Sequence, residues 1–334
     1  MRAVVLTSPA PIAEAGLELR DVDTPSPAAG EVLLKVLANA VCRTDLHVIE
    51  GELPDPKLPL IPGHMIVGRV EALGDGVTGV AVGDRLGVPW LGGTDGVCPY
   101  CRTGRENLCD HPTFTGYQRD GGYAEYVTAR ADFTLRIPEE YADIHAAPLL
   151  CAGLIGFRSL RLAEVEGLER PGRLGMYGFG SSAHIIIQAA LHLGHEVYAY
   201  TRGKTGQQLA LALGAAWAGG GDDVPPVELD SVIIFAPAGP LVPLALRAVR
   251  KGGVVVCAGI HMSPIPSFEY DLLWGERVLR SVANLTRADG HDFLALAPDV
   301  PIQTDVEVYP LEAARDALVR MKAGEVVGTA VLVP

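Results

Sequence analysis

The chain lacks long apolar runs, internal repeats and low-complexity segments. Its longest hydrophobic stretch, around Ala146–Phe157, is interrupted by Pro and Gly and falls short of the roughly 20 residues that cross a bilayer. The first residues, Met1–Thr7, resemble a strand and lack the pattern of a signal peptide. We therefore expect neither a membrane protein nor a secreted one.

Positive charge and cysteine are also scarce. The 334 residues include 27 Lys and Arg against 40 Asp and Glu, which gives a net charge of −13. Such a surface repels phosphate backbones and anionic lipid, so nucleic acid and membranes are not expected partners. Six cysteines are too few for a disulfide framework in a chain of this length, and Cys98, Cys101 and Cys109 cluster as metal ligands do. A reduced, cytoplasmic location fits this usage.

Two domains are expected, because the chain is too long for one ordinary core. Up to about residue 150, short apolar strands such as Val32–Leu37, Gly68–Ala72 and Tyr123–Thr128 are separated by Gly and Pro, which predicts antiparallel β-structure. From about Gly153 strands alternate with helices, which predicts a doubly wound parallel sheet. The predicted limits are 1–152 and 286–334 for a split β-rich domain, with the α/β domain 153–285 inserted in it.

The α/β prediction depends on a regular succession of elements. The predicted strands are Leu174–Tyr177, Val197–Tyr200, Ser231–Phe235 and Val254–Ala258. The predicted helices are Ala183–Leu193, Gln207–Leu213, Leu241–Arg250 and, in the C-terminal stretch, Leu311–Ala323.

A glycine-rich turn, Gly178-Phe179-Gly180-Ser181-Ser182-Ala183, joins the first of these strands to the first helix. It matches the dinucleotide fingerprint with alanine in the last place. The first glycine permits the tight turn, the second lets a pyrophosphate approach the backbone, and the helix N-terminus supplies oriented N–H groups. The alternative is a turn with a structural role only. The predicted cofactor-binding residues are Gly178, Gly180, Ser181 and Ser182, together with Ala236, Gly259 and Ile260 after later strands.

The end of the second strand of the α/β stretch lacks the acidic residue that would hold the adenosine ribose of NAD. Thr201 stands there, followed by Arg202 and Lys204. The missing carboxylate removes repulsion toward a 2′-phosphate, and the two cations can pair with it. NADP(H) is therefore favoured. In the alternative, the cations are ordinary solvated loop residues and NAD(H) is also accepted.

By its motifs the chain resembles the medium-chain zinc alcohol dehydrogenase family along nearly its whole length. The matching segments, besides the nucleotide fingerprint, are Val41–His47, Pro62–His64, Val82–Arg85, Gly121–Tyr126 and Pro148–Gly153. The resemblance implies a GroES-like catalytic domain that is split in sequence around a Rossmann domain.

The resemblance also implies the residues of a catalytic zinc site. Cys42, His64 and Cys151 would bind the ion, and this Cys₂His set leaves one coordination position open; alcohol dehydrogenase is the usual example of it. Asp45 would orient His64 from behind. Zinc there would stabilise an alkoxide, so that hydride can leave the alcohol carbon.

Two further roles follow from the resemblance. Thr44 would take the alcohol proton and pass it through the nicotinamide ribose hydroxyl to His47 and then to water. Arg43 would contact the cofactor pyrophosphate. Taken alone, His47 would be an ordinary surface histidine and Cys151 a small buried hydrophobe.

The second cysteine cluster resembles the structural zinc lobe of that family, in which four thiolates bind the metal. Here Asp95 stands in place of the first cysteine, before Cys98, Cys101 and Cys109. A carboxylate oxygen can bind zinc but is a harder ligand, so weaker retention of metal is expected. The alternative is a metal-free lobe. Cys257 fits neither set and is expected to pack in a strand.

Three positions depart from the family's pattern. Met65 replaces the Glu that usually follows the zinc-binding histidine, Ile155 replaces a Thr, and Thr329 replaces an Arg that usually reaches the pyrophosphate. Trp90 and Leu91 are expected to line the substrate pocket, where the indole would favour small or slender alcohols and aldehydes. Packing beneath the lobe is the alternative role of Trp90.

The expected function is a zinc-dependent alcohol dehydrogenase or aldehyde reductase that uses NADP(H) or NAD(H). Its substrate would be a small primary or secondary alcohol, or the matching aldehyde or ketone. One alternative is a zinc-free quinone or enone reductase on the same fold, although such relatives lack the Cys–His–Cys set. Another is a nucleotide-binding protein with impaired catalysis. A homodimer or homotetramer is expected.

Overall fold

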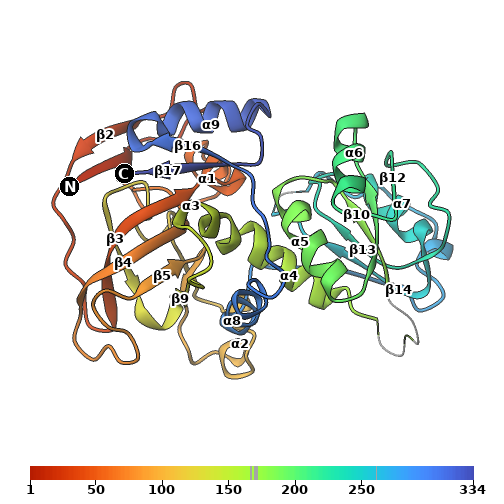
Figure 1. Cartoon of the computed structure of the whole chain (residues 1–334), viewed down its shortest axis with the longest axis horizontal. Coiled ribbons are helices and arrows are strands. Elements are labelled where there is room, and N and C mark those ends of the chain that lie inside the picture. Colours follow the sequence, from red (N-terminus) through yellow and green to blue (C-terminus); the bar gives the residue numbers. More distant parts are fainter. Residues whose placement is uncertain (166–167, 169–171, 261) are drawn as a thin grey trace. The chain divides into compact units, whose positions relative to one another are not determined.

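The computed structural model describes residues 1–165, 168, 172–260 and 262–334, which form two compact units (Figure 1). The first unit comprises Met1–Cys151, Asn284–Pro298 and Gln303–Pro334. The second comprises Ala152–Ala283 with Asp299–Ile302. The first unit is thus discontinuous in sequence. No described helix is both long and apolar enough to cross a bilayer.

The first unit is built on a seven-stranded sheet whose neighbouring strands run antiparallel, except for one parallel pair, β16 and β17. Alternate residues of the long strand β3, Val32, Leu34 and Val36, are buried in one core, as a half-buried strand requires. In order across the sheet the strands are β16 (Val306–Pro310), β17 (Thr329–Val333), β3 (Glu31–Ala40), β4 (Met65–Leu73), β5 (Arg85–Val88) and β9 (Leu135–Arg136), and β8 (Tyr126–Arg130) also pairs with β3.

Two small antiparallel sheets and short helices complete this unit. The sheets are β1 (Arg2–Leu6) with β2 (Leu17–Asp21), and β6 (Leu91–Gly93) with β7 (Thr113–Phe114). The α-helices are α1 (Arg43–Ile49), α2 (Pro99–Arg102), α3 (Asp143–Ala146), α8 (Arg287–Leu296) and α9 (Ala314–Ala323). The 3-10 helices are η1 (Glu106–Leu108), η2 (Ala131–Phe133), η3 (Ala147–Leu150) and η5 (Leu311–Ala313).

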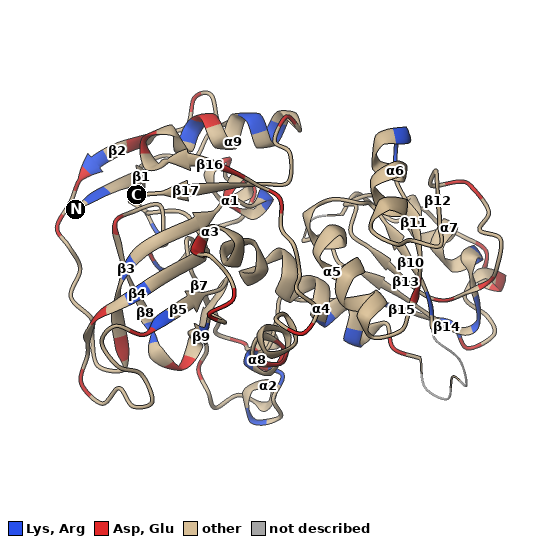
Figure 2. Ribbon diagram, viewed as in Figure 1, with Lys and Arg blue, Asp and Glu red and all other residues tan. Residues whose placement is uncertain are grey.

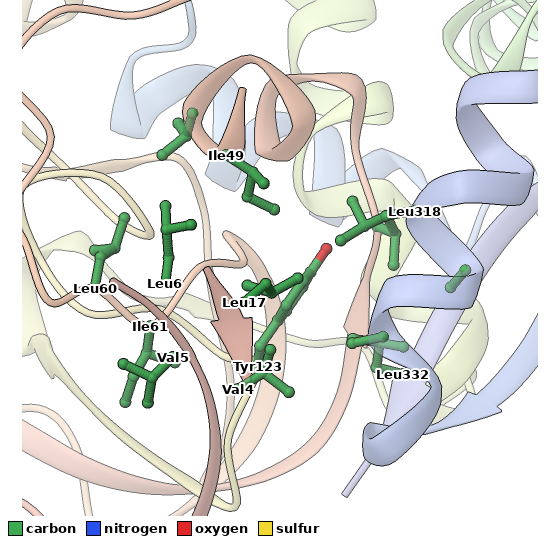
Figure 3. Close-up of a cluster of buried hydrophobic side chains, with 14 of the residues drawn as sticks. Val4, Val5, Leu6, Leu17, Ile49, Leu60, Ile61, Tyr123, Leu318 and Leu332 are labelled. Carbon is green, nitrogen blue, oxygen red and sulfur yellow. The ribbon is translucent and has the colours of Figure 1, made fainter. Parts of the chain in front are cut away.

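A second hydrophobic core of the first unit joins β1, α1 and α9. Figure 3 shows the ring of Tyr123 among aliphatic side chains that include Leu17, Leu318 and Leu332. Charged residues of both signs lie along α9 (Figure 2), whereas its Ala317 and Leu318 are buried in this core. The C-terminal segment is therefore part of the same core as the first strand.

The second unit is a six-stranded sheet in which all neighbouring strands are parallel. In order the strands are β12 (Trp217–Gly219), β11 (Glu196–Tyr200), β10 (Arg173–Tyr177), β13 (Leu229–Ile234), β14 (Val249–Cys257) and β15 (Val278–Ser281). The helices of this unit are α4 (Ala152–Leu162), α5 (Ser181–His192), α6 (Lys204–Ala212), α7 (Leu241–Ala248) and the 3-10 helix η4 (Tyr270–Leu272). The prediction of a β-rich domain and a doubly wound parallel sheet is confirmed.

The strand order of the second unit positions a binding site. From β10 the chain first proceeds outward through β11 and β12, and then returns to the other side of β10 with β13. Ligands of doubly wound sheets bind at the carboxyl ends of the strands where the order reverses in this way. The loops after β10 and β13 are therefore the expected place for a cofactor.

Several predicted elements have different limits in the structure. The strand predicted as Val254–Ala258 spans Val249–Cys257, and the helix predicted as Leu241–Arg250 ends at Ala248. Two further differences have a local cause. The strand predicted from Tyr123 begins instead at Tyr126, because the backbone of Tyr123 is bonded outside the large sheet, to Pro62 and to Val4. Helix α6 begins at Lys204 rather than Gln207, because Gly203 with φ of +79° serves as its N-cap residue.

Candidate functional site

The start of α1 fixes Cys42 and Asp45 relative to each other. Cys42 is the N-cap residue and has an extended backbone, with φ of −119° and ψ of 156°. Asp45, at the third helical position, accepts a hydrogen bond from the Cys42 N–H at 2.8 Å, as the acidic residue of a capping box does. A carboxylate in the first turn also interacts favourably with the helix dipole.

The segment before His64 brings a second element against this helix. Gly63 has φ of +97°, and a Cβ at this position would lie 2.4 Å from the ring of Tyr123. Only glycine allows both the backbone conformation and the close approach. His64 itself is fully buried, and its Nδ1 lies 2.7 Å from Oδ1 of Asp45.

Cys42, His64 and Cys151 converge within the first unit. The sulfur atoms of Cys42 and Cys151 are 3.9 Å apart, and one donor atom from each of the three residues lies within 4.8 Å of the other two. Because Nδ1 of His64 is bound to Asp45, Nε2 is the atom that faces the set, and it is buried without a hydrogen-bond partner. A buried polar atom without a partner is costly. These donors fit a divalent cation such as zinc.

The electrostatics of the three residues also suit a cation. Burial alone would lower the pKa of His64, but the charge and hydrogen bond of Asp45, with Cys42, outweigh it and raise the pKa to about 10. The hydrogen bond from Cys151 and the neighbouring His64 hold the pKa of Cys42 well below its ordinary value. The hydrogen bond to Cys42 and burial raise that of Cys151. A metal ion that replaces these protons would bind thiolates and a neutral imidazole.

Asp45 receives a third donor that the sequence did not indicate. The hydroxyl of Tyr123 donates to Oδ2 of Asp45 at 3.0 Å, and the tyrosine is fully buried. Burial and the Asp45 carboxylate raise the pKa of Tyr123 well above its ordinary value, so the hydroxyl stays protonated. Asp45 is thus held by the Cys42 N–H, His64 and Tyr123, which fixes the imidazole ring from behind.

An aromatic wall stands beside the histidine. The indole of Trp90 meets the His64 ring edge to face, with centroids 4.9 Å apart and planes at 71°. The rings of Phe114 and Tyr117 stack on the same indole at 4.9 and 5.9 Å. Leu91, in β6, is also buried and pairs with Phe114 in the sheet. Trp90 and Leu91 were named for this region in the sequence analysis, but Phe114 and Tyr117 were not.

Three further predicted residues of this region lie on α1. Thr44 is buried, and its hydroxyl lies 3.7 Å from the sulfur of Cys42. The Nδ1 atom of His47, one turn further along the helix, is bonded to the carboxylate of Glu52, a residue that sequence reasoning also missed. Arg43 is exposed at the first helical position.

The second cluster, Asp95, Cys98, Cys101 and Cys109, also comes together in the first unit. One donor atom from each residue lies within 4.8 Å of the others. Oδ1 of Asp95 accepts from the backbone N–H groups of Val97 and Cys98 at 2.9 and 3.0 Å. These bonds hold the pKa of Asp95 far below its ordinary value, so the carboxylate is ionised. Three cysteines and one carboxylate fit a tetrahedral metal site.

In the second unit, the predicted cofactor residues gather at the carboxyl ends of adjacent strands. Tyr177 pairs with both Tyr200 and Ile234, and Ile234 pairs with Cys257, so the residues that follow them share one edge of the sheet. The predicted residues at this edge are Gly178, Gly180, Ser181, Ser182, Thr201, Arg202, Lys204, Ala236, Gly259 and Ile260.

The glycine-rich turn has the shape that the fingerprint predicts. Gly178 has φ of +90°, and a Cβ there would lie 2.8 Å from the backbone nitrogen of Ala236. A Cβ on Gly180 would meet no atom within 4 Å, so this face of the turn is open. Helix α5 starts at Ser181 with no side-chain cap and no acidic residue in its first turn. An open helix N-terminus of this kind suits an anionic group.

The residues after β11 form an electropositive turn. Arg202 and Lys204 are exposed, and within the described ranges no carboxylate lies at ion-pair distance from either. Thr201 donates its backbone N–H to Gly219. Lys204 lies in the first turn of α6, where a cation is unfavourable unless an anion is near.

The chain is similar to known proteins of one family. Residues 28–139 match the family described as the alcohol dehydrogenase GroES-like domain. A probable alcohol dehydrogenase, AdhA, of Mycobacterium tuberculosis (strain CDC 1551 / Oshkosh) is 47% identical over 99% of this chain and 97% of its own length. An alcohol dehydrogenase of Geobacillus stearothermophilus is 37% identical over 95% of this chain and 96% of its own. The chain belongs to the alcohol dehydrogenase family.

Solved structures support the same family. The thermostable alcohol dehydrogenase of Pyrobaculum aerophilum, in a form with cobalt and zinc bound, has a TM-score of 0.88 and 28% identity, covering 100% of this chain and 99% of that one. The predicted GroES-like and Rossmann-type architecture is thereby confirmed. The protein is an oxidoreductase that acts on alcohols, and its substrates are small molecules.

The three residues that differ from the family's pattern lie in different elements of the structure. Met65 is 2% exposed in β4, so its side chain fills core space next to His64. Thr329 is buried in β17 and donates its backbone N–H to Asp305. Ile155 is half-buried in α4, in the second unit. Cys257 lies in β14, where burial raises the pKa of its thiol.

Proposed function

We propose that this enzyme is a zinc-dependent alcohol dehydrogenase or aldehyde reductase that favours NADP(H) over NAD(H). The carrying observation is the set of Cys42, His64 and Cys151, whose donor atoms lie within 4.8 Å of one another around a buried, unpartnered His64 Nε2. The Pyrobaculum aerophilum neighbour, with cobalt and zinc bound, supports the presence of metal in an enzyme of this fold.

The chain's own residues divide the work at this site. Bound zinc would supply a Lewis acid that stabilises the alkoxide form of the alcohol. Asp45 keeps Nδ1 of His64 occupied, so that Nε2 is presented to the metal. The Thr44 hydroxyl accepts the substrate proton, and His47 takes that proton up before it passes to water. Arg43 would bind the cofactor pyrophosphate.

The aromatic wall would limit the substrate. Trp90, braced by Phe114 and Tyr117, cannot swing away without losing two stacking contacts. A rigid indole next to the metal ligand His64 favours small or slender primary and secondary alcohols, with the matching aldehydes and ketones. Leu91 adds an apolar lining.

Asp95, Cys98, Cys101 and Cys109 would hold a second, structural zinc ion. Their donors are all protein atoms, and four of them complete a tetrahedron with no open position. The ionised Asp95 would serve as an oxygen ligand in place of a thiolate.

The cofactor preference follows from the turn after β11. Gly178, Gly180, Ser181 and Ser182 would bind the pyrophosphate at the N-terminus of α5, and Ala236, Gly259 and Ile260 would contact the nicotinamide half. Thr201 would hydrogen-bond the 2′-phosphate of NADP, and Arg202 and Lys204 would pair with it.

Metal analysis combined with kinetics tests the proposal. Alcohol-dependent reduction of NADP and of NAD is measured side by side, before and after treatment with a chelator that is then removed. We expect two zinc ions per chain, one for each set, a faster reaction with NADP, and loss of activity that zinc restores. Equal rates before and after complete removal of metal would contradict the zinc mechanism and favour the zinc-free alternative.

The cofactor preference has its own test. Thr201→Asp places a carboxylate beside the expected 2′-phosphate, so the KM for NADP should rise while that for NAD stays the same or falls. Lys251→Ala, an exposed cation on another strand, is the matched control. An unchanged KM for NADP in Thr201→Asp would show that this turn does not contact the phosphate.

A further inference from the structure

The C-terminal end of α1 places Glu52 against His47. Gly51 follows the last helical turn with φ of +76°, the left-handed conformation that ends a helix. The Gly51 N–H donates to Val48 at 3.2 Å, and the Glu52 N–H donates to the carbonyl of His47 at 2.9 Å. This pair of bonds is a Schellman motif, which brings the residue after the glycine back over the residue one turn earlier. The position of Glu52 is thus set by backbone geometry.

The side chains of the same two residues are bonded to each other. The Nδ1 atom of His47 is hydrogen-bonded to Oε2 of Glu52. The His47 side chain is 14% exposed, whereas that of Glu52 is 49% exposed. An ionised carboxylate can only accept a hydrogen bond, so Nδ1 must carry the proton. The bond therefore selects one of the two tautomers of the imidazole.

We propose that Glu52 is a positioning residue for proton transfer, which holds His47 as the Nδ1–H tautomer so that Nε2 keeps the lone pair that accepts the substrate proton. This inference rests on the proposed dehydrogenase function, in which His47 takes up the proton of the alcohol. As the O–H bond of the alcohol breaks, the Thr44 hydroxyl takes up that proton and gives up its own. The proton relayed in this way forms an N–H bond at Nε2, and the ring becomes an imidazolium. The Glu52 carboxylate balances its positive charge until Nε2 loses the proton to water.

If the pair of His47 and Glu52 had only a structural role, removing it would lower the stability of the fold rather than the rate of proton transfer. An ion pair with a half-exposed partner contributes little to the stability of the fold. The turn itself is held by backbone bonds that any residue except proline can make at position 52. Substitution of Glu52 should therefore leave stability nearly unchanged and alter proton transfer.

Kinetics of the zinc-loaded enzyme give the first test. Glu52→Ala should lower kcat for alcohol oxidation about 10-fold, the lower end of the effect of removing a carboxylate behind a functional histidine, with the Kd for the cofactor unchanged. Glu52→Gln keeps an acceptor for Nδ1–H but loses the charge that balances the imidazolium, so its kcat should lie between those of Glu52→Ala and the unmodified enzyme. Glu18→Ala, which removes an exposed carboxylate paired with Arg20, is the matched control and should behave as the unmodified enzyme.

The double variant separates this inference from the function on which it rests. If Glu52 acts through His47, adding Glu52→Ala to His47→Gln causes no further loss. Additive losses would overturn the inference and leave the dehydrogenase proposal standing. Unchanged alcohol oxidation in His47→Gln itself would overturn both the proton pathway and the role of Glu52.

The ¹⁵N chemical shifts of the imidazole give a readout that does not depend on activity. In enzyme labelled at its histidines, the signals of His47 are assigned by their loss in His47→Gln. We expect the Nδ1–H pattern in the unmodified enzyme and in Glu52→Gln, and a shift toward the Nε2–H pattern in Glu52→Ala. An identical tautomer in all three proteins would overturn the inference.

Discussion

The two metal-type clusters of the first unit are assembled in opposite ways. Cys42, His64 and Cys151 come from distant parts of the chain, and side chains support them: Asp45 holds His64, and Tyr123 holds Asp45. Asp95, Cys98, Cys101 and Cys109 come from one short segment. There the backbone gives the support, as in the two N–H groups that bind Asp95 and the Cys101 N–H that lies 3.5 Å from the sulfur of Cys98.

This difference shows what each cluster can do. A site made by distant residues exists only when the fold is complete, and its three ligands leave a position for substrate. A site within one segment can form locally, and its four ligands leave none. The lobe is also tied to the rest of the unit, since Glu106 accepts bonds from the backbone and side chain of Arg287 at the start of α8. The first cluster is suited to chemistry and the second to holding structure.

Removing a ligand of the first cluster should have the largest effect on activity. Cys42→Ala takes away one thiolate, so we expect loss of one zinc per chain and a fall in kcat/KM of about 1000-fold, which corresponds to several kcal/mol of lost charge stabilisation. Zinc content by elemental analysis and steady-state kinetics measure both. Cys257→Ala removes a cysteine outside both clusters and should change neither. Full zinc content in Cys42→Ala would contradict the assigned ligand set.

A ligand of the lobe should affect metal content and stability before chemistry. Asp95→Ala is expected to lose the second zinc and lower the Tm, because both an oxygen ligand and two backbone hydrogen bonds disappear. Asp95→Asn keeps an acceptor for those N–H groups and separates the two causes. Asp95→Cys supplies a softer ligand and should release zinc more slowly to a chelator. If all three variants kept the zinc content and the Tm of the unmodified enzyme, Asp95 would not be a ligand. A content of one zinc per chain in all of them would mean a metal-free lobe, and two would mean a zinc held by the cysteines alone.

Both the local cluster and the parallel sheet can be predicted from the sequence, because each depends on a pattern of residues that lie close together along the chain. The spacing of Cys98, Cys101 and Cys109 lies within one segment, so nearby ligands can be identified without knowing the fold. In the second unit the strands alternate with helices, and the carboxyl ends of parallel strands must share an edge. The alternation of strands and helices is therefore enough to place Gly178, Thr201 and Ala236 together.

The ligands of the first cluster and the side chains that support them could not be predicted from such local patterns. The sulfur atoms of Cys42 and Cys151 meet across 109 positions and were identified only by resemblance to the family. Tyr123 reaches Asp45 across 78 positions, and its ring is placed by the crowding of Gly63, which no local pattern specifies. Glu52 is different, because the Glu50-Gly51-Glu52 end of a short helix is a local signal for the turn that brings it to His47.

The smallest effect is expected from removing the Tyr123 hydroxyl, one of the side-chain groups that support the first cluster. Tyr123→Phe removes one hydroxyl and leaves the ring in its core (Figure 3). Asp45 then keeps two of its three donors. A hydrogen bond to a charged group contributes about 1.5 kcal/mol or more, so zinc at the first cluster should bind about tenfold more weakly in competition with a chromogenic chelator. The zinc of the lobe should be retained as before.

Tyr141→Phe is the matched control for this last variant. Its hydroxyl is also buried in the first unit but donates to the backbone carbonyl of Ala297 at 2.8 Å, away from either cluster. Both variants should lower the Tm by a similar amount, since each loses one buried hydrogen bond. Only Tyr123→Phe should weaken zinc binding at the first cluster. Equal zinc affinity in the two variants would mean that Asp45 orients His64 without help from Tyr123. The side chains that determine zinc affinity would then be the ligands and Asp45, and the Tyr123 hydroxyl would contribute only to the stability of the core.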